Sequence, residues 1–455
     1  MNTVKDFSGY VNPEKMAEDY LTYYYYLKGH EIVFPLNPFS FLKEERILFK
    51  LNDFSKLEGV YIPASSNNDV AIVGINANRP ITRQRFTAAH ELCHHLHDST
   101  RQVSCPINGK KTYIEQFADS FAAALLMPIG ALEEQVCKYK NERGFVDFDD
   151  VLDIANFFGV SFESCLYRIA YKLFAIEGDT KSEVLKKSIS HYKPDKVRKQ
   201  RHITYAKLYA DLIDEYQEQL SYLPSKRAKI LFQTDYIYND SRMEGVNVTI
   251  EQASEIVADL RLKTQNSVYC NEEYECYLSI AGHYEMYQKI FANFNQKKVS
   301  VFEIFDLNKK LFSCYPYPEY GGSIRQTNTL VMGAKFETVD YHSIYAELTN
   351  LEKYVCSYYT LSEHLKISDF VKYVVITHHK LTVIHAFQDG NGRTSRAFMN
   401  MQLVRFGIPP IYIFVKDKEE YTSALELADK TGDYEELFEL ILKCIIRSHI
   451  ELTKQ

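Results

Sequence analysis

Residues 385–396 read His-Ala-Phe-Gln-Asp-Gly-Asn-Gly-Arg-Thr-Ser-Arg, and they are the most informative stretch of this 455-residue chain. They bring one imidazole, one carboxylate, two glycines and two guanidinium groups together where a helix is expected to begin. Glycine allows backbone N–H groups to approach phosphate oxygens, and the N-terminal end of a helix favours anions. The stretch therefore predicts a site that handles the phosphates of a nucleotide.

The same stretch resembles the motif HxFx(D/E)GNGRxxR of the Fic family, and nearly every defining position is met. Ala386 is the exception, because proline is usual there; this residue shapes the loop and carries no chemistry, so activity is expected to survive. Phe387 is expected to anchor the loop in the core. The resemblance implies a protein nucleotidyltransferase (an AMPylator) with a mostly α-helical Fic core over residues 291–455. A Fic fold that has lost its activity remains the alternative.

The resemblance and the side-chain chemistry assign a role to each polar group of the motif. His385 is the predicted general base: it accepts the proton of a target hydroxyl, which attacks the α-phosphorus of ATP and expels pyrophosphate. Asp389 is expected to hold magnesium against the α and β phosphates, Arg393 to pair with the phosphate tail, and Arg396 to reach the terminal phosphate. The loop backbone that approaches the phosphates of ATP is expected at three residues: Gly390, Asn391 and Gly392.

Two stretches outside the motif extend the resemblance. Residues 323–339 stand where Fic proteins have a small β-hairpin flap that clamps the target peptide by adding a strand. Residues 240–245, Asp-Ser-Arg-Met-Glu-Gly, resemble the inhibitory motif (S/T)xxxE(G/N), although Asp240 stands where Ser or Thr is expected. In such proteins the glutamate pairs with the second arginine of the Fic motif. The resemblance therefore implies that Glu244 pairs with Arg396 and blocks productive seating of the terminal phosphate.

Residues 90–94 read His-Glu-Leu-Cys-His and give the N-terminal part of the chain a second chemical motif. Histidines at positions i and i+4 of a helix project from one face, so His90 and His94 can share one metal ion. Glu91 points into the same cleft and is the predicted catalytic base. A hydrolytic zinc site has three protein ligands and one open position for water, so a third ligand must come from elsewhere in the chain.

A second helix, expected over residues 112–127, supplies that ligand. Glu115 is the candidate third zinc ligand. Asp119, one turn further on, is the candidate partner that orients a zinc histidine through its free ring nitrogen. The neighbouring His95 and His97 are expected to be packing or surface residues. A helical histidine pair completed by a downstream carboxylate is the arrangement of a gluzincin.

Residues 83–95 and 115–128 together resemble the ImmA/IrrE family of metallopeptidases, and the resemblance covers roughly residues 10–175. Cys93 stands where many relatives carry glycine. Members of the family cut transcriptional repressors, so the resemblance implies an α+β gluzincin-like peptidase domain, residues 1–176, with a repressor or antitoxin as its substrate. The alternative is a zinc-free or catalytically silent module that senses or binds a partner.

Length and composition limit the classes of protein. The chain exceeds the size of one ordinary core, and 46% hydrophobic with 25% charged residues indicates a folded, multidomain protein. The net charge of -7 argues against direct nucleic-acid binding. Nine scattered cysteines without a CxxC pair favour a reducing, cytoplasmic compartment, and there is no apolar run of membrane-spanning length. The charged segment 177–202 is interpreted as a linker, followed by a helical region over residues 203–290.

The combined prediction is an autoinhibited protein nucleotidyltransferase fused to a zinc endopeptidase that cleaves a regulatory protein or the chain itself. A cut within residues 177–202 would leave Glu244 attached to the Fic core, so a separate protein is at least as plausible a substrate. Removal of AMP from modified proteins, with Glu244 positioning water, is an alternative, and transfer of phosphate or another nucleotide stays open. Homodimers are common among Fic proteins, but no residue here decides the matter. Both resemblances imply a toxin–antitoxin, mobile-element or phage-defence setting.

Overall fold

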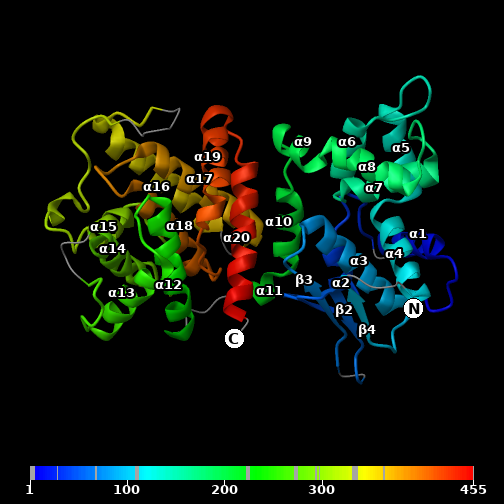
Figure 1. Ribbon diagram of the computed structural model, residues 1–455, viewed down its shortest axis with the longest axis horizontal. Coiled ribbons are helices and arrows are strands. Elements are labelled where there is room, and N and C mark those ends of the chain that lie inside the picture. The colour runs from blue at the N-terminus through cyan, green and yellow to red at the C-terminus, as the bar shows by residue number, and fades with distance from the viewer. Residues whose placement is uncertain are drawn as a thin grey trace. The chain divides into compact units, whose positions relative to one another are not determined.

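The computed structural model describes most of the chain as two compact units, residues 1–215 and 216–455 (Figure 1). The described residues are 6–27, 29–66, 69–107, 112–221, 226–270, 275–292, 295–296, 298–329, 337–361 and 364–453. The segment 177–202, interpreted above as a linker, contains helices α8 (Ser182–Tyr192) and α9 (Pro194–Gln200) and lies within the first unit. The two units are described separately below.

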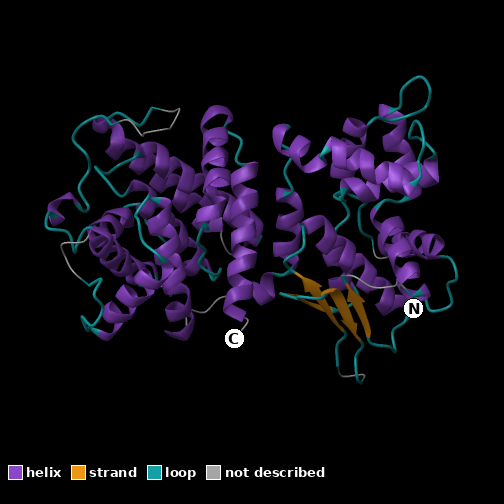
Figure 2. Ribbon diagram, in the orientation of Figure 1, coloured by secondary structure: helices purple, strands orange, loops and turns teal. Residues whose placement is uncertain are grey.

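The first unit contains a four-stranded mixed sheet with the strand order β1-β3-β2-β4 (Figure 2). Strands β1 and β3 are parallel, and the other two pairs are antiparallel. The register between β2 and β4 is irregular between Leu57 and Gly59, and β4 is an edge strand. The strand bounds are β1 (Leu48–Asn52), β2 (Leu57–Ile62), β3 (Ile72–Asn76) and β4 (Val103–Pro106).

Two helices at the centre of this unit carry the predicted metal ligands. Helix α3 (Ile81–His97) packs against β2 and β3 and against helix α4 (Tyr113–Leu126). The side chain of Thr112 caps the start of α4, and Pro128 follows its end, where proline disfavours continuation. The remaining helices of the unit are α1 (Pro13–Thr22), α2 (Pro38–Glu44), α5 (Ile129–Tyr139), α6 (Phe148–Phe158), α7 (Phe162–Arg168) and α10 (Ala206–Glu215).

A fully buried arginine connects α3 to the end of α6. Arg85 donates hydrogen bonds to the carbonyl oxygens of Leu36 (2.6 Å) and Gly159 (3.0 Å). Gly159 ends α6 with a φ of 64°. A Cβ atom at this position would lie 2.7 Å from the side chain of Leu208 and 3.1 Å from the Arg85 guanidinium. Both the backbone conformation and the lack of space therefore require glycine.

The second unit is mostly helical and is organised around helix α18 (Asn391–Phe406). This helix is buried along nearly its whole length and packs against α14 (Glu275–Ile290), α15 (Glu303–Leu311) and α17 (Ile367–Ile384). The other helices are α11 (Gln217–Leu220), α12 (Lys226–Met243), α13 (Ile250–Leu262), α16 (Ile344–Leu361), α19 (Lys418–Thr431) and α20 (Glu435–Thr453). The predicted fold class, an α+β domain followed by a mostly helical domain, is confirmed.

Part of the predicted flap, residues 330–336, lies outside the described residues. At its start, Ile324 forms a single antiparallel bridge with Phe387 of the Fic motif. The chain therefore runs beside the motif at the base of the predicted flap.

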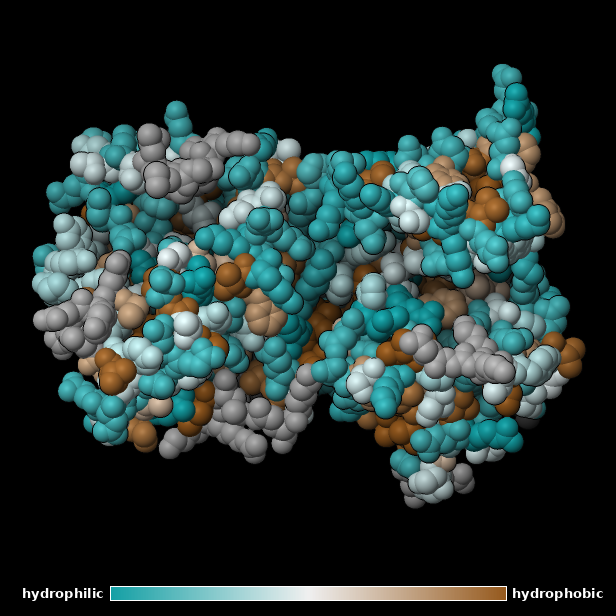
Figure 3. Space-filling view, in the orientation of Figure 1, coloured by the Kyte–Doolittle hydropathy of each residue, from teal (hydrophilic) through white to brown (hydrophobic). Residues whose placement is uncertain are grey.

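Polar side chains occur on the surface and also in the interior of both units. The face of the molecule in Figure 3 carries mainly hydrophilic residues, with hydrophobic ones in scattered patches. Among the described residues, none of the helices combines the length and apolar character that a membrane crossing requires. The buried polar side chains include Glu91 and His94 in the first unit and Asp240 and Arg396 in the second. Buried polar groups require partners, and these partners define the candidate sites.

Candidate active sites

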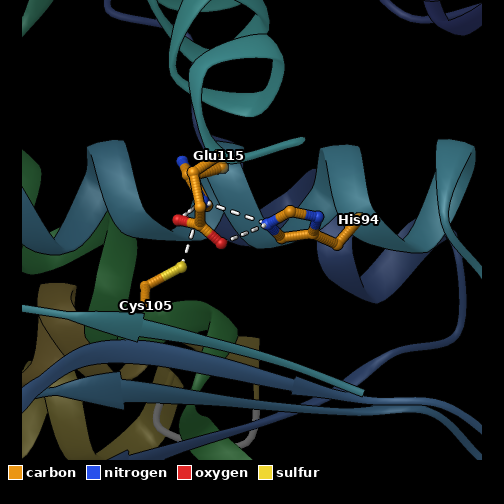
Figure 4. Close-up of side chains that lie close together, drawn as sticks. His94, Cys105 and Glu115 are labelled. Atoms are coloured by element: carbon orange, nitrogen blue, oxygen red, sulfur yellow. Dashed lines mark hydrogen bonds and ion pairs between the residues drawn. The ribbon is translucent and has the colours of Figure 1, made fainter. Parts of the chain in front are cut away.

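The three predicted metal ligands, His90, His94 and Glu115, lie together where α3 packs against α4. Figure 4 shows two of them, His94 and Glu115. The Nε2 atom of His90 is 3.1 Å from Nε2 of His94 and 3.3 Å from Oε2 of Glu115. The distance from Nε2 of His94 to Oε1 of Glu115 is 3.6 Å. Both imidazoles are buried, and the glutamate side chain is 13% exposed. Two imidazole nitrogens and one carboxylate, directed at one point, are a suitable donor set for zinc.

A fourth donor, which sequence reasoning missed, joins these three. Cys105 on β4 places its Sγ atom 3.0 Å from Nε2 of His90. The ligand atoms of His90, His94, Cys105 and Glu115 all lie within 4.8 Å of one another. Burial, with the nearby Glu91 carboxylate, raises the pKa of this thiol. An isolated cysteine on a strand has no characteristic spacing, so only the packing of β4 beside α3 and α4 reveals its place.

Two carboxylates on the outer side of the cluster orient its histidines. Oδ1 of Asp119 is 3.0 Å from Nδ1 of His90, and Oδ2 of Asp98 is 3.2 Å from Nδ1 of His94. Asp119 was predicted in this position, whereas Asp98, the residue directly after α3, was not. Each carboxylate leaves the Nε2 atom of its histidine directed inward. Although burial disfavours the imidazolium, Asp119 and Glu115 raise the pKa of His90 to about 9, so a metal ion bound at Nε2 would displace a proton.

Glu91 is fully buried beside the cluster. Neither of its carboxylate oxygens has a hydrogen-bond partner among the described residues, and burial raises its pKa. A Cβ atom at Gly59 of β2 would lie 2.5 Å from Oε1 of Glu91, so glycine makes room for this carboxylate. A cavity of about 160 Å³ opens beside the cluster and is lined by His90, Cys105 and Glu115 among others. An orphaned buried carboxylate beside this donor set fits a metal centre with an acceptor for the proton of water.

The neighbouring histidines and Cys93 lie outside this cluster. Nδ1 of His95 is 3.2 Å from the hydroxyl of Tyr61, and Nε2 of His97 is 2.9 Å from the carbonyl oxygen of Tyr10. Cys93 is completely buried on α3 and is not among the grouped donors. The two histidines therefore make packing contacts of the kind expected from the sequence.

In the second unit, the predicted phosphate loop joins α17 to α18 by a tight turn. His385 follows α17 with a φ of 49°, and Gly390 precedes α18 with a φ of 76°. A Cβ atom at Gly390 would lie 2.7 Å from the side chain of Leu311, so the position requires glycine. The side chain of Asn391 accepts a hydrogen bond from the backbone N–H of Phe387 (2.8 Å) and donates one to its carbonyl oxygen (2.7 Å). These contacts fix the loop ahead of the helix.

Asn308 on α15 holds the loop from the other side, and its role was not predicted from the sequence. Its amide group donates to the carbonyl oxygen of Asp389 and to the hydroxyl of Thr394, each at 3.1 Å. Its side-chain oxygen accepts from the backbone N–H of Gly322 at 2.9 Å. The Asn308 side chain is completely buried, so it is an internal brace of the loop.

The first residues of the motif are anchored by Arg325 and by core packing. The backbone N–H of Arg325 donates to the carbonyl oxygen of Ala386 (3.0 Å), and its Nε atom donates to that of His385 (2.8 Å). Phe387 is 2% exposed and packs edge-on against Phe305, as its expected anchoring role requires. Burial, together with the charge of Arg325, lowers the pKa of His385. A neutral imidazole, able to accept a proton, is therefore favoured.

Asp389 and Arg393 are two further charged residues of the motif, and they lie next to each other. The Asp389 side chain is 67% exposed, and an oxygen of its carboxylate lies 3.3 Å from the guanidinium of Arg393. The Arg393 side chain is 7% exposed and its guanidinium lies over the ring of Phe312. The carboxylate of Asp389 is thus accessible from solvent.

Arg396 contacts two carboxylates of the preceding region. Its NH2 atom is 2.5 Å from Oε1 of Glu244, the partner that the inhibitory motif implied, and its Nε atom donates to Asp240. Oδ2 of Asp240 is in turn 2.9 Å from Nε2 of the buried His283 on α14. Although burial opposes ionisation, Arg396 and His283 lower the pKa of Asp240 to about 2. The residue that departs from the inhibitory motif is therefore a second, more deeply buried anion for the same arginine.

Glu244 also lies at the N-terminal end of α18. A Cβ atom at Gly392 would be 2.6 Å from Oε1 of Glu244 and 3.0 Å from NH1 of Arg396. Helix N-termini bind anions, because their first N–H groups lack partners within the helix. The Glu244 carboxylate is therefore an anion that lies at this helix end.

These geometries define two candidate chemical centres, a helix pair with donors suited to a metal ion and a helix N-terminus suited to an anion. Residues 52–170 match the model of the IrrE N-terminal-like domain, and residues 298–403 match the model of the Fic/DOC family. The chain therefore contains an IrrE-like domain followed by a Fic domain, and both predicted resemblances are confirmed.

Curated relatives match the part of the chain that carries the Fic domain. "Protein adenylyltransferase Fic" of Nematostella vectensis is 27% identical over 247 residues, which are 52% of this chain and 54% of that protein. The protein of the same name from Drosophila melanogaster is 29% identical over 220 residues, which are 48% of this chain and 42% of that protein. The chain thus spans about half of the length of these relatives.

Two solved structures were also found by comparison of folds. Fic-1 from C. elegans gives a TM-score of 0.47 at 16% identity and covers 72% of this chain and 92% of that one. A Fic domain containing signaling protein from Bacteroides thetaiotaomicron gives 0.44 at 22% identity, with coverages of 54% and 96%.

Proposed function

We propose that the Fic domain transfers AMP from ATP to a Ser, Thr or Tyr hydroxyl of a protein, that Glu244 inhibits this transfer, and that the IrrE-like domain is a zinc-dependent endopeptidase. The names of the curated relatives support adenylyl transfer. The observation that carries the proposal is the tight loop between α17 and α18, in which His385 follows one helix and Gly390 precedes the buried helix α18.

In the proposed transfer, His385 accepts the proton of the target hydroxyl while the hydroxyl oxygen forms a bond to the α-phosphorus of ATP. The bond from that phosphorus to the oxygen bridging to the β-phosphate breaks, and pyrophosphate leaves. The lowered pKa of His385 supports its role as a base. Asp389 would hold magnesium, which neutralises phosphate charge. Arg393 and the N–H groups of Gly390, Asn391 and Gly392 would bind the phosphates.

Inhibition follows from the position of the Glu244 carboxylate. It pairs with Arg396 and lies against Gly392. It therefore takes the position beside the guanidinium and the helix end that would receive the terminal phosphate. A phosphate group cannot share that space with a carboxylate, because like charges repel and the sites coincide. Removing the side chain of Glu244 would free the helix end and the NH2 atom of Arg396, whereas Nε of Arg396 would keep its bond to Asp240.

The proposed peptidase site uses the cluster of α3 and α4. His90, His94 and Glu115 would hold zinc, which polarises a peptide carbonyl and activates water. Glu91 would accept the proton of that water, since it is a buried carboxylate without a hydrogen-bond donor. Asp119 would keep His90 in the tautomer that binds metal. The proposed substrate is a repressor, an antitoxin or the chain itself.

Intact-mass spectrometry of the purified full-length protein with ATP, Mg²⁺ and Zn²⁺ tests both activities. We expect Glu244→Gly to gain the mass of one or more AMP units, and this gain to be absent when His385→Ala is added. Self-cleavage would yield fragments that are absent in Glu91→Gln. If wild type and Glu244→Gly modify neither themselves nor supplied protein substrates, while His385 and the loop remain folded, the transferase proposal is wrong.

The same variants separate the two alternatives. If the Fic domain removes AMP and Glu244 positions water, Glu244→Gly abolishes activity on an AMP-modified protein, whereas the inhibitory role predicts a gain of transfer. If the IrrE-like domain is a sensor without turnover, Glu91→Gln retains zinc and partner binding and changes no cleavage pattern. Loss of cleavage with zinc retained supports the endopeptidase.

A further inference from the structure

The metal cluster of the first unit has one donor more than a hydrolytic zinc site uses. Such sites have three protein ligands and an open position for water, whereas structural zinc sites are closed by a fourth protein ligand. Cys105 adds a thiol to His90, His94 and Glu115, and all four donor atoms lie within 4.8 Å of one another. The Cys105 thiol could either lie beside the metal ion or bind to it.

The distances between the donor atoms distinguish these two arrangements. In a tetrahedral zinc site, bond lengths of about 2.0 Å to nitrogen or oxygen and about 2.3 Å to sulfur place two nitrogen or oxygen donors about 3.3 Å apart and a nitrogen about 3.5 Å from a sulfur. The observed separations are 3.1 Å between the imidazoles, 3.3 and 3.6 Å from imidazole to carboxylate, and 3.0 Å from His90 to Cys105. The sulfur is about 0.5 Å nearer to His90 than the tetrahedral value, so Cys105 lies within reach of the metal position as a fourth donor.

We propose that Cys105 binds the metal ion as a thiolate and closes its fourth coordination position. Binding would release the thiol proton to solvent as the sulfur–metal bond forms. The metal then has no place for the water that Glu91 is positioned to deprotonate, so the zinc-bound form of the domain is latent until Cys105 moves away. This inference rests on the proposed zinc site and adds its state of coordination.

The element that carries Cys105 is suited to such movement. Strand β4 has four residues, lies at the edge of the sheet and pairs with β2 alone, across an irregular register next to Gly59. His90 and His94, in contrast, lie on the long helix α3, which packs against β2, β3 and α4. A short edge strand with a broken register separates from its sheet more easily than a packed central helix moves. Of the residues compared, Cys105 is thus the proposed ligand whose backbone is held least firmly by its neighbours.

Cobalt substitution of the full-length protein tests this coordination directly. Metal-free protein is titrated with Co²⁺, and a thiolate-to-cobalt charge-transfer band in the near ultraviolet is expected for the wild type. The band should disappear in Cys105→Ser and remain in Cys137→Ser, a matched control at an exposed cysteine of the same unit. Because losing even an outer partner lowers metal affinity by about 10- to 100-fold, Cys105→Ser should weaken zinc binding by about 100-fold or more in a chelator competition.

The outcomes separate failure of this inference from failure of the zinc site. If wild type binds one zinc but shows no thiolate band, or if Cys105→Ser keeps both band and affinity, the inference is wrong and the zinc site stands. If wild type binds no metal at this cluster, the proposed peptidase site itself fails. Should Cys105→Ser not fold, X-ray absorption of zinc-loaded wild type decides: a sulfur neighbour at about 2.3 Å supports the proposal, and nitrogen and oxygen neighbours alone refute it.

Discussion

The two carboxylates that bind Arg396 should have opposite importance for regulation and for stability. The Asp240 side chain is 4% exposed and also accepts from His283, whereas that of Glu244 is 30% exposed. A partly exposed ion pair contributes about 0.2–1 kcal/mol. Removing one partner of a buried pair costs about 3–5 kcal/mol, because the other charge is left without compensation. In Glu244→Ala, Arg396 keeps Asp240; in Asp240→Ala, both Arg396 and His283 lose a buried acceptor.

These energies translate into melting temperatures. For a domain of this size, 1 kcal/mol shifts the melting temperature by about 2–4 °C. We therefore expect a loss of less than about 4 °C for Glu244→Ala and of roughly 6–20 °C for Asp240→Ala, measured by calorimetry, with Asp240→Asn as the control of equal shape. Intact mass with ATP and Mg²⁺ should show AMP incorporation rising in Glu244→Ala. Equal losses of stability in the two variants, or no rise in transfer while ATP binds, would refute this division of roles.

Three further predictions follow from the loop and its neighbours. In a Glu244→Ala background, His385→Ala should lower the transfer rate about 10²- to 10⁴-fold, while the ATP affinity measured by calorimetry stays unchanged. Because burial lowers the pKa of His385, the transfer rate should fall on the acid side only below pH 6.5. An acid limb above pH 6.5 would contradict the assignment of His385 as the base. Asn308→Ala removes three hydrogen bonds, one each to the loop, to α18 and to Gly322, and should destabilise the protein by about 1–3 kcal/mol and weaken ATP binding. Lys309→Ala, on the exposed side of the same helix, should do neither. Asp240 has a pKa of about 2, below its ordinary value of 3.8, so its contribution to stability should be full above pH 3.8 and be lost as the pH falls towards 2. In acid unfolding curves, Asp240→Asn should not show this loss of stability. A curve for the variant that runs parallel to that of wild type would speak against the buried pair.

The sequence could predict the parts of the sites that depend on local spacing. The spacing of His90 and His94 predicted a helix, which is α3 of the structure, and a second helix was expected over residues 112–127, close to α4. The phase of one helix then brings His90 and His94 to one face. In the same way, the compact motif after α17 predicts the loop, because its glycines and its asparagine act within a few residues.

Three of the residues that were missed reach their sites through tertiary packing. Cys105 comes from a strand, Asn308 from α15 and His283 from α14, and none of these three belongs to a pattern of fixed spacing. Asp98 is different, because it lies four residues after His94 and its i,i+4 spacing was visible in the sequence. Asp240 was visible in the sequence only as a departure from a motif. Its role depends on His283 and Arg396, which lie far from it along the chain and meet it only in the folded unit.

The hydrogen bond from Arg85 to Gly159 connects the turn after α6 to the helix that carries two of the proposed metal ligands. The guanidinium that binds the carbonyl oxygen of Gly159 belongs to α3, the helix that bears His90 and His94. Any larger residue at position 159 would press on Leu208 and on this guanidinium, and would shift the helix that aims both imidazoles. A substitution at this turn would therefore disturb the proposed metal site, although Gly159 lies outside the donor cluster.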